Sequence, residues 1–228
     1  MRYALIVLLF SSHSWVARSP GPMLPEGCPD LTGQGRKEYV CPPCGCRGDD
    51  ASHDKQGNCP TCGMEMVDRA TTMSLSAIPN FLKVSDSVWT GGQPTLAHLG
   101  KLKEEGVKAI INLRMHEEHD GAVEAAKAKK LGMTYVNVPV DFDDPKTSDV
   151  DSFLKATDEL LKNGRVFIHC AAAIRVGAFW MIRRALRDGW EYEEAREEAK
   201  QIGLRRDGTW VDFAKTTIDR RRLKGDGK

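Results

Sequence analysis

The sequence lacks an excess of either charge and lacks a hydrophobic run long enough to cross a membrane. Its 228 residues include 33 Lys and Arg against 32 Asp and Glu, so the net charge of +1 creates no global field for nucleic acid or an anionic membrane. The basic runs near the C-terminus also lack the interleaved aromatic residues of a nucleic-acid site. The composition, 41% hydrophobic and 29% charged, excludes collagen, disordered polymers and multi-span membrane proteins. We therefore expect no nucleic-acid partner and no stable membrane span, and any anion site must be local.

A short apolar run, Tyr3 to Phe10, follows Arg2 at the N-terminus. This pattern predicts a secretory signal peptide over residues 1–17, with export across the inner membrane and a periplasmic location. A buried N-terminal strand is the alternative, but the prolines and glycine of residues 20–25 would separate such a strand from any fold. Residues 18–38 are rich in Pro, Gly and polar side chains and predict a linker.

Large apolar residues are scarce in the next segment, 39–67, which is dominated by Cys, Pro and Gly and needs a staple to fold. It holds two C-x2-C pairs, Cys41 with Cys44 and Cys59 with Cys62, separated by fourteen residues. Four thiolates spaced in this way suit one tetrahedral zinc ion, so we expect a structural zinc in a small zinc-ribbon-like module. A pair of disulfides is the alternative in an oxidising compartment.

Three further side chains of the module, Cys46, His53 and Met64, are possible additional ligands, and we expect each to be a bystander. The segments Tyr39–Pro42 and Gly57–Val67 resemble the small heavy-metal-binding modules at the N-terminal side of bacterial efflux components. That family commonly has Met-His after the first Cys-Pro, where this sequence has Pro43-Cys44. The departure favours structural zinc over a transport metal, although the resemblance leaves open a metal-handling partner.

Residues 78–228 alternate short β-branched runs with helical patterns, which predicts a three-layer α/β domain with a central, mainly parallel sheet of four or five strands. The apolar runs predict strands and the amphipathic segments predict helices. A Ser-x-x-Asp capping pattern at Ser148 and Asp151 opens one helix. The expected strands are 109–113, 135–140 and 166–168, and the expected helices are 96–105, 117–131, 148–162, 176–187, 193–202 and 210–222.

The seventh cysteine, Cys170, stands alone after a predicted strand and precedes Arg175 by five positions. The backbone N–H groups of this loop and the start of the following helix can surround an oxyanion, which Arg175 can bind through bidentate hydrogen bonds. The same field favours a thiolate nucleophile at Cys170. The structural alternative is that Cys170 is a small buried side chain with no catalytic role, beside a core histidine, His169, whose hydrogen bonds are satisfied within the protein.

This segment resembles the cysteine-dependent, dual-specificity-like phosphatase superfamily, especially the phosphatase-like domain of beta-lactamase-hydrolase-like proteins. Further matching segments are 88–95, 110–114, 138–142 and 177–180. The resemblance implies cleavage of a phosphate monoester through a phosphocysteine, with no cofactor for catalysis. His169 would orient the loop, Cys170 attack phosphorus and Asp141 act as the acid, with Asp143 and Asp144 as rivals. The implied phosphate-binding residues are Ala171, Ala172, Ala173, Ile174, Arg175 and Val176.

Two departures from the phosphatase pattern keep other functions open. Four residues separate Cys170 from Arg175, a spacing also typical of rhodanese-like sulfurtransferases, and Val176 replaces the usual Ser or Thr. No glycine is present in Ala171–Ala173 to adopt positive φ easily. The alternatives are a sulfurtransferase and an inactive metal- or anion-binding envelope protein. Arg114, His116 and His119 are candidates for the rim of the site.

Overall fold

The computed structural model describes residues 37–42, 46, 48, 51–204 and 208–225. The predicted signal peptide and nearly all of the predicted linker lie outside the described residues. The chain divides into units 1–35 and 36–228, and the described elements belong to the second unit. Across the described ranges, no helix is long and apolar enough to cross a membrane.

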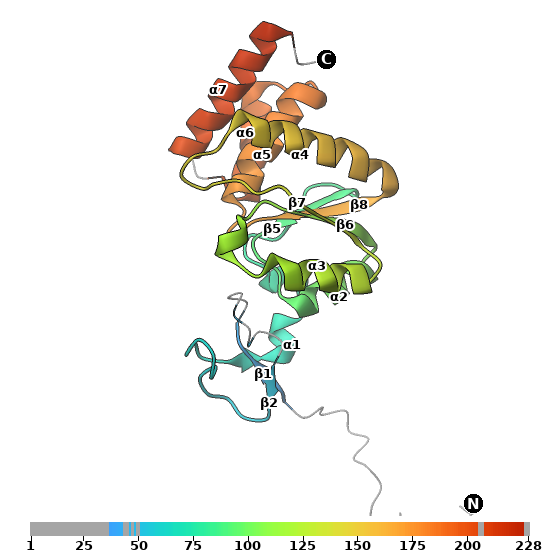
Figure 1. The fold of residues 1–228 in the computed structure, drawn as a ribbon, viewed down its shortest axis with the longest axis vertical. Helices are drawn as coiled ribbons and strands as arrows, with labels where there is room; N and C mark the ends of the chain where they lie inside the picture. The colour runs from blue at the N-terminus through green and yellow to red at the C-terminus, as the bar shows by residue number, and fades with distance from the viewer. Residues whose placement is uncertain (1–36, 43–45, 47, 49–50, 205–207, 226–228) are drawn as a thin grey trace, which may run out of the picture. The chain divides into compact units, whose positions relative to one another are not determined.

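A five-stranded sheet in the order β4-β5-β8-β6-β7 forms the centre of the α/β domain (Figure 1). β4 pairs antiparallel with β5 at one edge, and the other neighbouring strands are parallel. This confirms the predicted fold class. The strands are β4 (Leu82–Lys83), β5 (Val88–Gly91), β6 (Val107–Asn112), β7 (Thr134–Asn137) and β8 (Arg165–His169).

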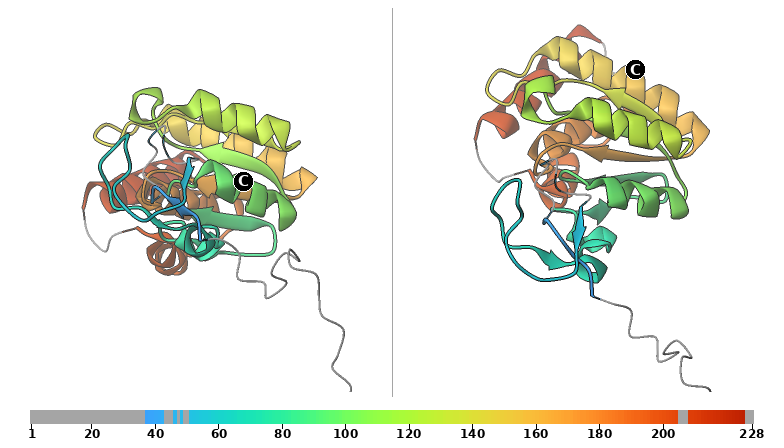
Figure 2. Two further views of the ribbon diagram at one scale, coloured as in Figure 1. Left: turned by 90° about the horizontal axis from the view of Figure 1, so that it is seen from below. Right: turned by 60° about the horizontal axis from the view of Figure 1, so that its bottom comes forward.

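Helices cover both faces of this sheet (Figures 1 and 2). Helices α2 (Leu96–Glu104) and α3 (Gly121–Lys130) lie on one face, over a smaller apolar core. The larger core lies on the other face and is shared by four helices. These are α4 (Thr147–Leu160), α5 (Ile174–Arg187), α6 (Tyr192–Ile202) and α7 (Thr209–Lys224).

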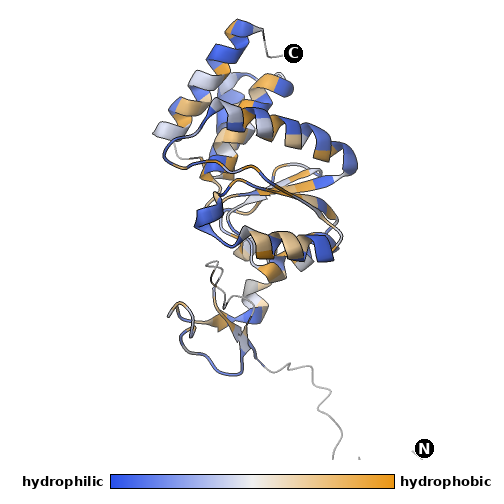
Figure 3. Ribbon diagram, viewed as in Figure 1, coloured by the Kyte–Doolittle hydropathy of each residue, from blue (hydrophilic) through white to orange (hydrophobic). Residues whose placement is uncertain are grey.

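The central strand β8 shows why the sequence forms this layered structure. Val166 and Ile168 point into the larger core, while Phe167, between them, points into the smaller one. A strand buried on both faces reads as a continuous apolar run rather than an alternating one, as here. Figure 3 shows the same distribution, with the strands mostly hydrophobic and the helices hydrophilic on part of their surface.

One expected helix and one expected strand have different bounds in the structure. The helix expected from residue 117 begins at Gly121, because the Asp120 side chain caps it by accepting from the Val123 N–H, 3.3 Å away. Residues 116–118 form a short 3-10 helix instead. The strand expected over 135–140 ends at Asn137, two residues before Pro139, which has no N–H for a ladder.

The capping pattern expected at Ser148 is also wrong. Helix α4 begins at Thr147, and the Asp149 carboxylate accepts from the Lys146 N–H at 3.0 Å. Asp151 pairs with Arg221 of α7 instead, at 2.6 Å.

The cysteine-rich segment contains a three-stranded antiparallel sheet of two-residue strands in the order β2-β1-β3. Its strands are β1 (Tyr39–Val40), β2 (Ser52–His53) and β3 (Val67–Asp68). The short helix α1 (Arg69–Thr72) and the 3-10 helix η1 (Leu75–Ala77) follow it in the chain. The ladders are too short to fold alone, which agrees with the expected need for a staple.

Candidate active site and cysteine cluster

The loop after β8 joins Cys170 to the first turn of α5. Cys170 is buried, and α5 begins at Ile174, two residues earlier than expected. Ala173 precedes the helix in the left-handed conformation, with φ 65° and ψ 3°. The turn therefore needs a positive φ at a position where this chain has no glycine, and the surrounding contacts must hold alanine there.

Segments distant in the sequence fix the backbone of this loop. The Ala171 carbonyl accepts from the Gln93 N–H at 3.1 Å, and the Ala172 carbonyl accepts from the Asn80 side-chain amide at 3.0 Å. Gly92 approaches so closely that a Cβ there would lie 2.6 Å from the Ala171 carbonyl oxygen. The 92–93 turn after β5 is therefore shaped to support the loop.

The first turn of α5 provides backbone donors for an anion. The first backbone hydrogen bond of the helix is donated by the Gly177 N–H to the Ala173 carbonyl, at 2.9 Å. The N–H groups of residues 174–176 precede that bond and have no acceptor within the helix. Together with the positive end of the helix dipole, they suit a bound oxyanion beside Cys170.

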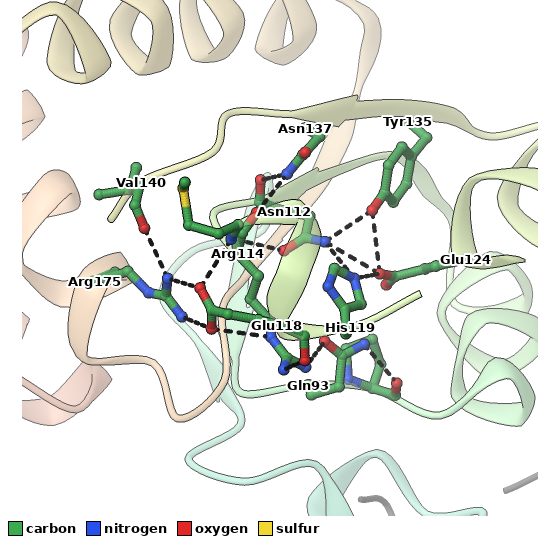
Figure 4. Close-up of polar contacts among 12 residues, drawn as sticks. Gln93, Asn112, Arg114, Glu118, His119, Glu124, Tyr135, Asn137, Val140 and Arg175 are labelled. Carbon is green, nitrogen blue, oxygen red and sulfur yellow. Dashed lines mark hydrogen bonds and ion pairs between the residues drawn. The ribbon is translucent and has the colours of Figure 1, made fainter. Parts of the chain in front are cut away.

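Arg175 lies at the base of this site, 1% exposed, and its side chain is held from one side (Figure 4). Its Nη1 and Nη2 donate to the two carboxylate oxygens of Glu118 at 2.5 and 2.6 Å, and Nη1 also donates to the Val140 carbonyl at 2.8 Å. Its Nε is buried without a hydrogen-bond partner among the described residues. Nε and the second Nη2 hydrogen remain to bind a ligand.

The charges around Arg175 stabilise its protonated form. Burial acts to lower the pKa of Arg175, but the hydrogen bonds and ion pair with Glu118, together with the interaction with Cys170, outweigh burial and raise the pKa. Burial likewise acts to raise the pKa of Glu118. The hydrogen bonds from Arg175 and the Met115 N–H, with the charge of Arg114, lower it to about 2. An arginine that interacts with a cysteine is the pairing that phosphoryl transfer to a cysteine requires.

Sequence reasoning missed Glu118, which lies 57 positions from its partner Arg175. The rim candidate Arg114 shares this carboxylate, with its Nε 3.3 Å from Glu118, and donates from Nη1 to Gln93 at 2.8 Å. Arg114 thus links the supporting turn to Glu118 (Figure 4). The sequence did contain one indication of Glu118, because an acidic residue four positions after Arg114 can form an ion pair with it.

Asp141, the expected acid, follows the Val140 carbonyl that Arg175 contacts. Its side chain is exposed, and Oδ1 accepts from the Asp143 N–H at 2.9 Å. This hydrogen bond closes a local turn, and the contact of Arg175 with the Val140 carbonyl places Asp141 beside the site. Of its rivals, Asp144 pairs with Lys146. Asp143 lines a cavity of about 380 Å³ together with Phe142, Ile174, Leu204, Gly208, Thr209, Trp210 and Val211.

His169 does not contact the loop through its side chain in any described hydrogen bond. Its ring stacks on Phe167 at 5.7 Å, and its Nε2 lies 3.0 Å from Glu124 Oε1. The side chain of the rim candidate His119 is also buried, with Nε2 3.2 Å from Glu124 Oε2. The third rim candidate, His116, is exposed.

Four cysteines of the N-terminal module form a cluster: Cys41, Cys46, Cys59 and Cys62, whose sulfur atoms all lie within 4.8 Å of one another. Cys46, which we expected to be a bystander, thus lies within the cluster. Its sulfur lies 3.8 Å from that of Cys41 and 4.0 Å from that of Cys59. The predicted ligand Cys44 lies outside the described residues, and His53 is not part of the cluster.

The sulfur geometry fits a metal ion. A tetrahedral zinc with Zn–S bonds of ~2.3 Å separates its sulfurs by about 3.8 Å. The Cys41 and Cys62 sulfurs lie 3.3 Å apart, well beyond the disulfide bond length of about 2.05 Å. Hydrogen bonds from the N–H groups of Cys62 and Thr61 lower the pKa of Cys59 to about 6, which favours the thiolate that binds a metal.

A cysteine directly after the central strand, an arginine in the following helical turn and a three-layer α/β domain together characterise the cysteine-dependent phosphatase fold. Residues 73–210 match the family described as DSP-PTPase phosphatase fused to NAD+ kinase. Because the match covers more than half of the chain, the protein belongs to that family. This confirms the resemblance inferred from the sequence.

Similar proteins agree with this assignment. The chain is 28% identical over 109 residues to a beta-lactamase hydrolase-like protein of Agrobacterium fabrum, a match covering 46% of this chain and 25% of that protein. The chain therefore spans about a quarter of the length of this curated relative. A putative phosphatase (DUF442) of Shewanella putrefaciens is 26% identical, with a TM-score of 0.55 and coverage of 64% and 95%. TpbA of P. aeruginosa, solved with pTyr, shares the fold at 19% identity, TM-score 0.53 and coverage of 64% and 89%.

Proposed function

We propose that the protein hydrolyses phosphate monoesters through a phosphocysteine intermediate at Cys170. The carrying observation is the buried Nε of Arg175, which has no hydrogen-bond partner in the described residues and lies at the helix start that follows Cys170. Because Glu118 occupies the opposite side of the guanidinium, the remaining donors are preorganised for two phosphoryl oxygens. Inserting a phosphate would satisfy a buried donor that otherwise costs free energy.

The chemistry runs in two displacements. The Cys170 thiolate attacks phosphorus, a P–S bond forms, and the bond to the leaving oxygen breaks as Asp141 donates it a proton. A water molecule then attacks the phosphocysteine and loses a proton to Asp141. The P–S bond breaks, inorganic phosphate leaves, and the thiolate is restored. Arg175 and the N–H groups of residues 174–176 hold the phosphoryl oxygens in both steps.

Two variants test this proposal on an activated aryl phosphate. Cys170→Ser is expected to abolish turnover, because a serine hydroxyl supplies no anion at neutral pH. Arg175→Lys should be nearly as damaging, because an ammonium cannot keep both the Glu118 bonds and a two-toothed grip on phosphate. Unchanged turnover in either variant would place the reaction elsewhere.

The four-residue spacing between Cys170 and Arg175 supports a second candidate, a rhodanese-like sulfurtransferase. The same purified protein should be assayed with thiosulfate and cyanide. Turnover faster than that of the aryl phosphate, and lost in Cys170→Ser, would assign the sulfurtransferase. Phosphate binding with no turnover of either substrate would assign the inactive envelope protein.

An apolar cavity beside the loop supports a phosphate ester with a flat leaving group, as in a protein-tyrosine or dual-specificity phosphatase. Phe142 and Trp210 line it with their rings 5.5 Å apart, and Ile174, the first residue of α5, forms part of the wall. The related TpbA fold was solved with pTyr. Trp210→Ala should raise KM for an aryl phosphate more than for an alkyl phosphate, and an equal rise would assign the cavity no role in selection.

For the N-terminal module we propose one structural zinc held by Cys41, Cys46, Cys59 and Cys62. The sequence predicted Cys44 in the place of Cys46, and Cys44 lies outside the described residues. A backbone N–H from Gly48 already points at the Cys46 sulfur, 3.3 Å away, as in closed thiolate sites. Elemental analysis should give one zinc per chain in the wild type, less in Cys46→Ser and an unchanged content in His53→Ala. Equal contents in all three would return Cys46 to a bystander. The proposed periplasmic location rests on residues 1–17 alone and is tested by cell fractionation.

A further inference from the structure

The turn formed by residues 78–81, between η1 and β4, lies against the Cys170 loop. It is anchored by Ile78, which is 1% exposed and packs in the smaller core. At its exposed end is Asn80, whose side-chain amide donates to the Ala172 carbonyl at 3.0 Å across 92 positions of sequence. An anchored segment therefore holds a peptide of the loop, and the proposed reaction has so far given this segment no role.

The backbone conformation of Asn80 is unusual. Its φ is 51°, and Ala173 is the other non-glycine residue with a positive φ in the described part of the chain. Asparagine adopts this left-handed conformation more readily than alanine does. The hydrogen bond from Asn80 ends on the carbonyl directly before Ala173. The two strained positions are thus joined, and strain of this kind persists only where surrounding contacts hold it.

This hydrogen bond fixes the direction of one backbone N–H group. In a trans peptide the carbonyl and the N–H of the next residue point in opposite directions. Because the Ala172 carbonyl points toward Asn80, the N–H of Ala173 points away from Asn80. That N–H donates to no backbone acceptor among the described residues. It directly precedes the donors of residues 174–176 in the first turn of α5.

We propose that Asn80 is a positioning residue that turns the Ala173 N–H toward the phosphoryl group, so that this donor joins those of residues 174–176. The inference rests on the proposed function, because it names a residue that prepares the same anion site. Asn80 touches no reacting atom and acts through the peptide between Ala172 and Ala173. With this peptide already oriented, the phosphoryl group gains a hydrogen bond that requires no rearrangement of the loop when the substrate binds.

The residue before Asn80 supports the loop by a second route. The Pro79 carbonyl accepts from the Gly92 N–H at 2.6 Å, and the next N–H along the chain, that of Gln93, donates to the Ala171 carbonyl at 3.1 Å. The carbonyls of two successive loop residues are therefore held, directly or through one turn, by a single segment. Loss of the Asn80 amide leaves the second route intact, so we expect a local change in one peptide and an otherwise ordered loop.

The test measures how well inorganic phosphate protects Cys170 from alkylation by iodoacetamide, with the modified residue identified by peptide mass spectrometry. Asn80→Gly removes the amide and allows the left-handed conformation, whereas Asn80→Ala removes the amide and disfavours that conformation. In both variants we expect the phosphate concentration for half protection to rise roughly tenfold, as for the loss of one hydrogen bond to a charged group. The KM for an aryl phosphate should rise by a similar factor with a smaller change in kcat, since the donor holds the phosphoryl oxygen before and during the reaction.

Asn163→Gly is the matched control. Asn163 is exposed, and its side-chain amide also donates to a backbone carbonyl, that of Glu159, at 3.4 Å. It lies before the start of β8, whereas Cys170 follows the end of that strand. The phosphate concentration for half protection should therefore stay at the wild-type value in this control.

Wild-type protection in folded Asn80→Gly would overturn the proposal, and weaker protection in Asn80→Ala alone would show that only the backbone conformation matters. Should Asn80→Gly fail to fold, Asn80→Asp provides the second measurement. Its carboxylate has the size of the amide but donates no hydrogen bond, so we expect protection to weaken at least tenfold. If phosphate gives the wild type no protection, the anion site and the proposed function fail together with this inference. Protection of the wild type that position 80 leaves unchanged overturns the inference alone.

Discussion

The close approach of Gly92 to the Cys170 loop gives a prediction whose size follows from the structure. A Cβ at position 92 would lie 2.6 Å from the Ala171 carbonyl oxygen, 2.9 Å from Pro79 Cβ and 3.1 Å from the Pro79 carbonyl oxygen. Ordinary contact begins at 3.4 Å, so the Ala171 carbonyl would have to retreat by about 0.8 Å. Both oxygens belong to backbone, and neither can move by a side-chain rotation.

Gly92→Ala is therefore expected to act on stability and on the anion site together. Forced movement in a packed region costs about 1–3 kcal/mol. The Ala171 carbonyl also accepts from the Gln93 N–H, so its displacement carries the loop with it. We expect the free energy of unfolding to fall by about 1–3 kcal/mol in urea titrations. Binding of inorganic phosphate, measured as protection of Cys170 from alkylation, should weaken at least tenfold.

Gly100→Ala is the matched control. Gly100 lies inside α2, and a Cβ there would meet no atom within 4 Å. Replacing a glycine inside a helix by alanine stabilises it by roughly 0.5–1 kcal/mol, so the control should be neutral or more stable with unchanged phosphate protection. Wild-type stability and protection in Gly92→Ala would refute the claim that the 92–93 turn shapes the loop.

Three further outcomes are expected. The pKa of Glu118, about 2, lies below its ordinary 4.5, so the pairing of Glu118 adds stability above pH 4.5 that is lost as the pH falls toward 2. In urea titrations over this pH range, the free energy of unfolding of Glu118→Gln should therefore fall less steeply with decreasing pH than that of the wild type. An equally steep fall in both proteins would contradict this prediction. Asp141→Asn should slow the turnover of an alkyl phosphate by ~10²–10⁴-fold and that of nitrophenyl phosphate only weakly. If the mutant and the wild type turn over both substrates at equal rates, Asp143 becomes the candidate for the acid. A strong chelator should remove the metal and make residues 39–67 newly susceptible to proteolytic cleavage, while the alkylation of Cys170 continues at its usual rate. A parallel loss of Cys170 reactivity would show that the two regions are coupled.

The parts of the fold predicted from the sequence are those set by local pattern. The strand before Cys170 was recognisable because Val166, Phe167 and Ile168 are apolar and suited to burial on both faces. The helices ending near Gly106 and Gly132 were recognisable because glycines with positive φ follow them. Local patterns of this kind need no knowledge of which segments meet in space.

The residues that sequence reasoning missed act through contacts between distant segments. Glu118 reaches Arg175 across 57 positions, and Glu124 reaches His169 across 45, which no spacing rule relates. Cys46 stands outside the two C-x2-C pairs, so the motif itself directed attention away from it. Glu118 and Glu124 become recognisable only when the sheet order brings β6 beside β8.

Contacts with a distant segment also explain why the loop holds Ala173 at a positive φ, a conformation that glycine would adopt at a lower energetic cost. Gly203, after α6, leaves room for it, since a Cβ at position 203 would lie 3.2 Å from the Ala173 Cβ. The strained conformation is thus held by a space that a later segment provides, and the missing loop glycine is no evidence against an ordered anion site. The departures from the phosphatase pattern near Cys170 should accordingly be judged against the segments that pack on the loop, which include those of Gly92 and Gly203.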